Sequence, residues 1–312
     1  MAWQNAPTLN KLTASRQGGN RGAQLWGVDY KGTVYTIYQK TPGGEWSGWS
    51  GPDWGGPGYP KQVYELAAAQ QGSGGVQIWV LDGKRQLWTN RQTQPGGGWE
   101  GWRGPGWNSM PGSLKFTKLT ATRLAGGQGA QFWGITDNGI LTSCSQIAPT
   151  GSWSPWTDFK PTPEKSQWIE VTAAQQGDGK GAMWGLDTKR QLWGTGQASV
   201  GGAWGAWNGP NWLGAPKLRN IAAAEGPNGA IIWGQDEDYR MVANFQVKPG
   251  TNEWSGWSSG DWHDAPLSYE LTAAGQNNGC VQLWAIDLTG VLHSIAQTPP
   301  GCAWGTWQPP RR

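Results

Sequence analysis

The chain repeats one motif six times, and this repetition limits its fold more than any other feature. Each copy holds an apolar residue followed by Trp and, about twenty residues later, the pattern W-x-x-W. The first of these tryptophans, called anchors below, are Trp26, Trp79, Trp133, Trp184, Trp233 and Trp284. The W-x-x-W pairs are Trp46 and Trp49, Trp99 and Trp102, Trp153 and Trp156, Trp204 and Trp207, Trp254 and Trp257, and Trp304 and Trp307. A period of about 50 residues is typical of repeat architectures such as propellers.

Each repeat is predicted to form four short strands separated by turns. A Leu-Thr-Ala segment gives the first strand, the anchor lies in the second, and a tight turn such as Asp137-Asn138-Gly139 leads into the third. The W-x-x-W segment gives the fourth, after a Pro-Gly loop. Gly and Pro every few positions exclude helical repeats, and a sandwich would not repeat at this length. We therefore expect an all-β fold, a six-bladed β-propeller with four-stranded blades and one repeat per blade.

This pattern predicts a single domain over residues 1–312. The repeats span about residues 9–60, 61–113, 114–165, 166–216, 217–266 and 267–312, with residues 1–8 completing the last blade.

Composition narrows the functional classes. The chain has 26 Trp and 51 Gly in 312 residues, with 14% charged residues and a net charge of +3. This is too aromatic for a disordered chain, and the charge is too small and scattered for a nucleic-acid interface. No apolar run approaches the 18 residues of a membrane helix. The start lacks a secretory signal, so we expect cytoplasmic synthesis, with non-classical release as the route to external glycans.

Catalytic and metal chemistry have little support in the sequence. His263 and His293 occupy non-equivalent places in their repeats, and no nucleophile elbow or phosphate loop occurs. We therefore predict no enzyme, no cofactor and no metal site, although a carboxylate pair for glycoside hydrolysis stays open. Cys280 and Cys302 head the second and fourth strands of one blade, roughly 9–10 Å apart. They are therefore expected to be thiols rather than a disulfide.

A third tryptophan follows the W-x-x-W pair by five residues in four repeats. These third tryptophans are Trp54, Trp107, Trp212 and Trp262, and a Gly-Pro turn precedes three of them. Trp3 is followed by the same Ala-Pro tail as Trp212 and Trp262, and the sixth repeat lacks a third tryptophan. We therefore predict that the termini meet and that Trp3 completes the sixth blade.

These tryptophans have two physical uses. The C–H face of a pyranose stacks on an indole ring, and the indole N–H can donate one hydrogen bond. The ring also fills the wedge between blades. The two rings of W-x-x-W point to opposite faces of their strand. We expect the anchors and strand pairs to be structural, whereas the third tryptophans, on loop-bound edges, and Trp3 are candidates for ligand binding.

Polar residues alternate between even and odd repeats. The even repeats have an acid before the first strand and a glutamine after it, namely Glu65, Glu170 and Glu270 with Gln71, Gln176 and Gln276. Repeats one and three instead have Arg16 and Arg123 after that strand. Two interpretations stay open: ion pairs across neighbouring blades, or hydrogen bonds to sugar hydroxyls in two alternating classes of pocket.

The segment GAQLWGVDYKGTVY followed by TPGGEWSGWSGPDW, and its counterpart VQLWAIDLTGVLH followed by QTPPGCAWGTW, carry a family resemblance. The chain resembles the Photorhabdus-type fucose-binding propeller lectins and, more distantly, the tectonins, although it has six repeats rather than seven. The resemblance implies a multivalent lectin with pockets between blades for fucose or O-methylated sugars, and glycans as partners. The alternatives are a protein-interaction or structural propeller and, less favoured, a glycan-active enzyme. Oligomerisation stays open.

Overall fold

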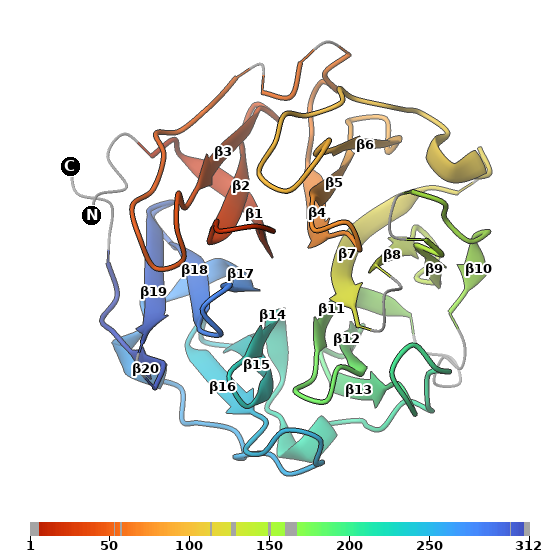
Figure 1. The fold of residues 1–312 in the computed structure, drawn as a ribbon. Coiled ribbons are helices and arrows are strands. Elements are labelled where there is room, and N and C mark those ends of the chain that lie inside the picture. The colour runs from red at the N-terminus through yellow and green to blue at the C-terminus, as the bar shows by residue number, and fades with distance from the viewer. Residues whose placement is uncertain are drawn as a thin grey trace.

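The computed structural model describes residues 6–52, 54–56, 58–112, 114–125, 129–148, 151–159, 167–299 and 301–308. In this part of the chain the strands form six antiparallel sheets, or blades, around a central axis (Figure 1). The strands of each blade follow one another in chain order, and the first lies nearest the axis. The predicted all-β fold with six blades is confirmed.

The blades have the following strands. Blade 1 contains β1 (Leu9–Arg16), β2 (Ala23–Asp29) and β3 (Val34–Tyr38), and blade 2 contains β4 (Glu65–Gln70), β5 (Val76–Leu81) and β6 (Leu87–Arg91). Blade 3 contains β7 (Phe116–Leu124), β8 (Gly129–Thr136), β9 (Leu141–Ser145) and β10 (Thr157–Asp158), and blade 4 contains β11 (Trp168–Gln175), β12 (Gly181–Asp187) and β13 (Leu192–Gly196). Blade 5 contains β14 (Leu218–Gly226), β15 (Gly229–Asp236) and β16 (Met241–Phe245), and blade 6 contains β17 (Ser268–Gly275), β18 (Val281–Asp287), β19 (Leu292–Thr298) and β20 (Ala303–Trp304).

The prediction of four strands in every blade is only partly right, because the described blades have three or four. The fourth segment of blade 2 meets β6 at two isolated bridges, Thr89 with Arg103 and Gln92 with Trp99. Between these bridges Gly101 has a φ of 102°. This conformation, open to glycine, interrupts the regular ladder.

A glutamine ends the third strand of every blade and ties it to the second. Its side-chain oxygen accepts the backbone N–H of the residue 16 positions earlier, as from Ala23 to Gln39 and from Val76 to Gln92, both at 3.0 Å. The six glutamines are Gln39, Gln92, Gln146, Gln197, Gln246 and Gln297, and those with a printed exposure are almost fully buried. They satisfy a donor that would otherwise be buried without a partner.

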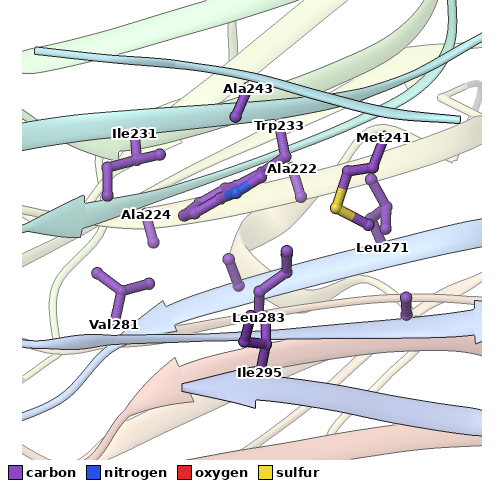
Figure 2. Packing of buried hydrophobic residues seen from close by; sticks show 12 residues of the cluster. Ala222, Ala224, Ile231, Trp233, Met241, Ala243, Leu271, Val281, Leu283 and Ile295 are labelled. Atoms are coloured by element: carbon purple, nitrogen blue, oxygen red, sulfur yellow. The ribbon is translucent and has the colours of Figure 1, made fainter. Parts of the chain in front are cut away.

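The anchors form the core between blades. Each of the six is at most 1% exposed. Trp233 of blade 5, for example, lies in one cluster with Leu271 and Leu283 of blade 6 (Figure 2). Burying such a ring contributes roughly 4–6 kcal/mol at about 25 cal/mol per Å². The anchors therefore hold neighbouring blades together.

The cysteine prediction is wrong, because Cys280 and Cys302 form a disulfide with a Cα–Cα distance of 5.3 Å. The estimate of two strand spacings assumed that both residues continue straight strands. Cys302 instead lies in the turn before β20, with a left-handed φ of 52°, and this turn folds back toward the start of β18. Cys144 is a buried free thiol, and burial raises its pKa.

Blades 1 and 6 lie side by side. Lys11 of β1 forms an ion pair with Glu270 of β17 at 2.8 Å, and Ala6 packs against a cluster that includes Trp284. Trp3 lies outside the described residues, so its place in the sixth blade stays a prediction. In the described part of the chain the helices are three-residue 3-10 turns, and none could span a membrane.

Candidate functional site: aromatic clefts between blades

Each cleft between neighbouring blades brings tryptophans of two repeats together. In four clefts, a third tryptophan of one blade meets the first W-x-x-W residue of the next at nearly right angles. The centroid distances are 4.7 Å for Trp54 and Trp99, 5.0 Å for Trp107 and Trp153, 4.8 Å for Trp212 and Trp254, and 5.0 Å for Trp262 and Trp304. The anchor of the first blade packs beneath both rings, as Trp184 does at 5.8 Å from Trp212. Clefts are named below by their two blades.

The turn before the third tryptophan sets its position. In blade 4 the chain passes over Trp193 so closely that a Cβ on Gly209 would lie 2.6 Å from the indole ring. Glycine is therefore required at this close approach. Trp193 is itself held by a hydrogen bond from its Nε1 to the Oδ2 of Asp187 at 3.1 Å. The third tryptophan then begins a short 3-10 turn, η2 (Trp212–Gly214), like η1 (Trp107–Ser109) and η3 (Trp262–Asp264).

The third tryptophans differ from the anchors in their access to solvent. All four are half-buried, and among the described residues their indole N–H groups donate to no protein atom and are not enclosed. The second W-x-x-W tryptophan instead donates backward in three clefts, as from Trp257 to the backbone oxygen of Trp212 at 3.4 Å. Each third tryptophan thus offers both a ring and a free donor to a ligand.

Cleft 3/4 replaces the third tryptophan with phenylalanine. Phe159 lies 5.4 Å from Trp204 and 6.2 Å from the anchor Trp133. Sequence reasoning missed it because it follows Trp156 by three residues rather than five. In cleft 6/1, Trp46 packs 5.9 Å from the anchor Trp284.

The clefts share this aromatic corner but differ in size. The cavities hold about 1010 Å³ in cleft 4/5, 280 Å³ in cleft 5/6 and 70 Å³ in cleft 2/3. The residue before the recurring glutamine lines each one, and it is Gly196, Phe245 and Arg91 respectively. A missing side chain accompanies the widest cleft, whereas large ones reduce the other two.

The polar groups of the clefts also differ. Cleft 4/5 is lined by amides and hydroxyls, including Asn208, Asn211, Thr251 and Asn252. Such groups donate and accept hydrogen bonds without charge, as sugar hydroxyls require.

The two smaller clefts use other chemistry. In cleft 5/6, His263 packs on Trp262, and Cys302 of the disulfide forms part of the wall. In cleft 2/3, Glu100 holds Arg91 at 2.8 Å and Arg103 at 2.9 Å. These three positions are charged only in blade 2, so this cleft differs from the others in electrostatics.

The three candidate glutamates lie at the axis, apart from the aromatic corners. Lys118 bridges Glu65 at 3.6 Å and Glu170 at 2.9 Å, and Lys11 pairs with Glu270. Burial raises the pKa of Glu65. Burial alone would lower the pKa of Lys118, but Glu170 and Glu65 outweigh it and raise that pKa well above its usual value. These contacts favour the ion-pair interpretation for the acids.

The remaining candidates divide between structural contacts and the axis. Gln71 bonds to Gln77, and Gln276 bonds to Gln282 at 3.2 Å, all four being buried. Gln176 accepts from Gln246 of the next blade at 3.2 Å and also lines the cavity of cleft 4/5.

Arg16 and Arg123 line the other end of the central channel. Thus, of the polar candidates, Gln176 lies nearest the aromatic clefts.

The fold and the clefts together define a six-bladed β-propeller with repeated aromatic sites between its blades. Three solved structures of similar fold are lectins. AofleA from Arthrobotrys oligospora has a TM-score of 0.67 and 13% identity, covering 96% of this chain and 86% of that chain. The BP39L lectin from Burkholderia pseudomallei has a TM-score of 0.63 and 17% identity, covering 96% and 83%.

The third is the Aleuria aurantia lectin, described with a six-bladed β-propeller fold and a novel fucose recognition mode. It has a TM-score of 0.62 and 15% identity, covering 96% of this chain and 95% of that chain. At these identities the likeness shows the fold alone. No family model matches the chain, and no curated protein matches it in sequence.

Proposed function

We propose that this chain is a non-enzymatic, multivalent lectin that binds carbohydrate in the clefts between its blades. The observation that carries the proposal is the pair of nearly perpendicular indole rings, 4.7–5.0 Å apart, in four clefts. The half-buried third ring can stack on the C–H face of a pyranose while its free N–H donates to a hydroxyl. Several such sites on one rigid ring convert modest affinities into avidity.

Fucose is the first sugar to test, and O-methylated sugars are the second. The Aleuria aurantia lectin was solved in complex with α-methyl-L-fucoside, and its chain covers nearly all of this one. The motif resemblance to Photorhabdus-type lectins points to the same two classes of sugar. Cleft 4/5, with its uncharged amides around Trp212 and Trp254, is the best candidate pocket.

A glycan array followed by calorimetry tests the proposal. We expect binding of a fucoside with more than one site per chain, and haemagglutination that millimolar free monosaccharide inhibits. Trp212→Ala should remove one class of site and leave the others. Leu288→Ala changes a half-exposed apolar residue of a turn in blade 6 and serves as the control. One site per chain, or no sugar binding, would contradict the proposal.

One observation favours a second candidate, a structural or protein-interaction propeller. Trp212 contacts three other indole rings, at 4.8 Å, 5.8 Å and 6.5 Å, as a core residue would. Silence on the array, together with a large loss of stability in Trp212→Ala, would favour this candidate. Turnover of a bound glycan would instead identify an enzyme.

A further inference from the structure

The central channel carries a ring of polar side chains at each mouth. The first strands of the six blades surround the axis (Figure 1). The acidic mouth consists of Lys11, Glu65, Lys118, Glu170, Asn220 and Glu270. Five residues further along the same strands, roughly 17 Å away, the basic mouth consists of Arg16, Gln70, Arg123, Gln175, Glu225 and Gly275.

The acidic mouth is complete within the protein. Lys118 serves two glutamates, and Lys11 serves Glu270. Asn220 also donates to Glu270 at 3.3 Å. Every charged side chain of this mouth therefore has a partner of opposite charge.

The basic mouth is not complete. Arg16 forms an ion pair with Glu225 at 3.3 Å. Arg123 donates to the neutral amide oxygen of Gln70, and no carboxylate among the described residues lies within ion-pair distance of it. Two guanidinium groups thus face one carboxylate, which leaves a net charge of +1 around the channel.

The two arginines act on each other through this space. Burial lowers the pKa of Arg123, and the charge of Arg16 lowers it further, while Glu225 only partly opposes them. A bound anion would offset both effects, because it would solvate the guanidinium groups and screen their repulsion.

The channel also has room for such an anion. A cavity of about 80 Å³ lies among the residues of the basic mouth. One water needs only about 10–15 Å³ of this kind of volume. Gly275 contributes no side chain to the ring, so the sector of blade 6 stays open.

We propose that the basic mouth binds a small tetrahedral oxyanion, sulfate or phosphate, between Arg16 and Arg123. The planar guanidinium forks supply paired N–H donors that match its oxygens. This site is separate from the aromatic clefts and does not depend on sugar binding.

Thermal unfolding with sodium sulfate tests the site. The salt is varied from 0 to 10 mM at constant ionic strength, balanced with sodium chloride. We expect the Tm of the full chain to rise and reach a plateau, because an anion that binds only the folded state stabilises it by mass action. Arg123→Gln removes the unpaired charge and should abolish the rise. Arg103→Gln, an exposed arginine of cleft 2/3, should keep it.

Glu225→Gln provides a variant of opposite sign. It removes the one carboxylate of the basic mouth, so the plateau should be reached at several-fold lower sulfate. An equal rise in the unmodified chain and in Arg123→Gln would reflect general salt exclusion and would overturn the proposal.

Crystals grown without sulfate or phosphate and soaked in sodium selenate give a second test that does not depend on variants. The proposal expects an anomalous selenium peak between Arg16 and Arg123. No peak on the axis would overturn it.

Discussion

The clefts between blades and the channel along the axis use the same repeat in opposite ways. In the clefts, nearly identical aromatic rings recur from blade to blade, whereas in the channel lysine, glutamate and asparagine replace one another at one position. Apolar packing is non-directional, so identical units stack well. Buried charges must meet opposite charges, so the repeats had to diverge where they face one another.

Removal of an anchor should give the largest effect. Trp79→Ala empties a fully buried site between blades 2 and 3 and is expected to lower the free energy of unfolding by about 3–5 kcal/mol. Urea unfolding at neutral pH measures this loss, with Leu288→Ala as the control within about 0.5 kcal/mol. A loss below about 1 kcal/mol for Trp79→Ala would show that the clefts do not depend on their anchors.

Removal of a lysine from the channel should come next. Lys118→Gln leaves Glu65 and Glu170 without their shared cation and is expected to cost about 3 kcal/mol at neutral pH. The double variant Lys118→Gln with Glu170→Gln should recover much of this loss. If the double variant is no more stable than the single one, packing rather than charge explains the role of Lys118.

A third tryptophan should matter less for stability than the anchor beneath it. Trp212 is half-buried while Trp184 is 1% exposed, so Trp212→Ala is expected to cost about 1–2 kcal/mol and Trp184→Ala at least twice as much. Equal losses, measured by the same urea titration, would place both rings in the core and argue against a ligand role for Trp212.

The smallest effect should be a pH-dependent one at the axis. Burial raises the folded-state pKa of Glu65 above its ordinary value of 4.5. Its protonation therefore stabilises the fold below about pH 4.5, and this stabilisation is lost as pH rises through the folded pKa. Relative to Glu65→Gln, the unmodified chain should lose stability over that range. A difference that stays constant from pH 4 to 8 would contradict the raised pKa.

Much of the fold could be predicted because one repeat encodes one blade. The alternation of apolar pairs, turns and W-x-x-W fixes six sheets, and the Gly-Pro turn marks the third tryptophan. Phe159 escaped prediction because the third blade reaches the same corner with a shorter spacing. The recurring glutamine was overlooked because its partner, 16 residues away, becomes visible only when the strands are paired.

The axis was harder to predict than the clefts. Glu65 and Arg16 recur by parity in the sequence, but periodicity along one strand does not show which residues meet across six blades. The disulfide failed for a related reason, since the turn that holds Cys302 folds back rather than continuing the strand.

That disulfide has a consequence for where one cleft reaches its final form. Thiols inside cells are kept reduced by glutathione and thioredoxin, whereas oxidising surroundings allow the cross-link to persist. Cys302 forms part of the wall of cleft 5/6, and blade 6 alone among the described blades has such a cross-link. The molecule would therefore leave a reducing compartment with one cleft unfinished and complete it only outside.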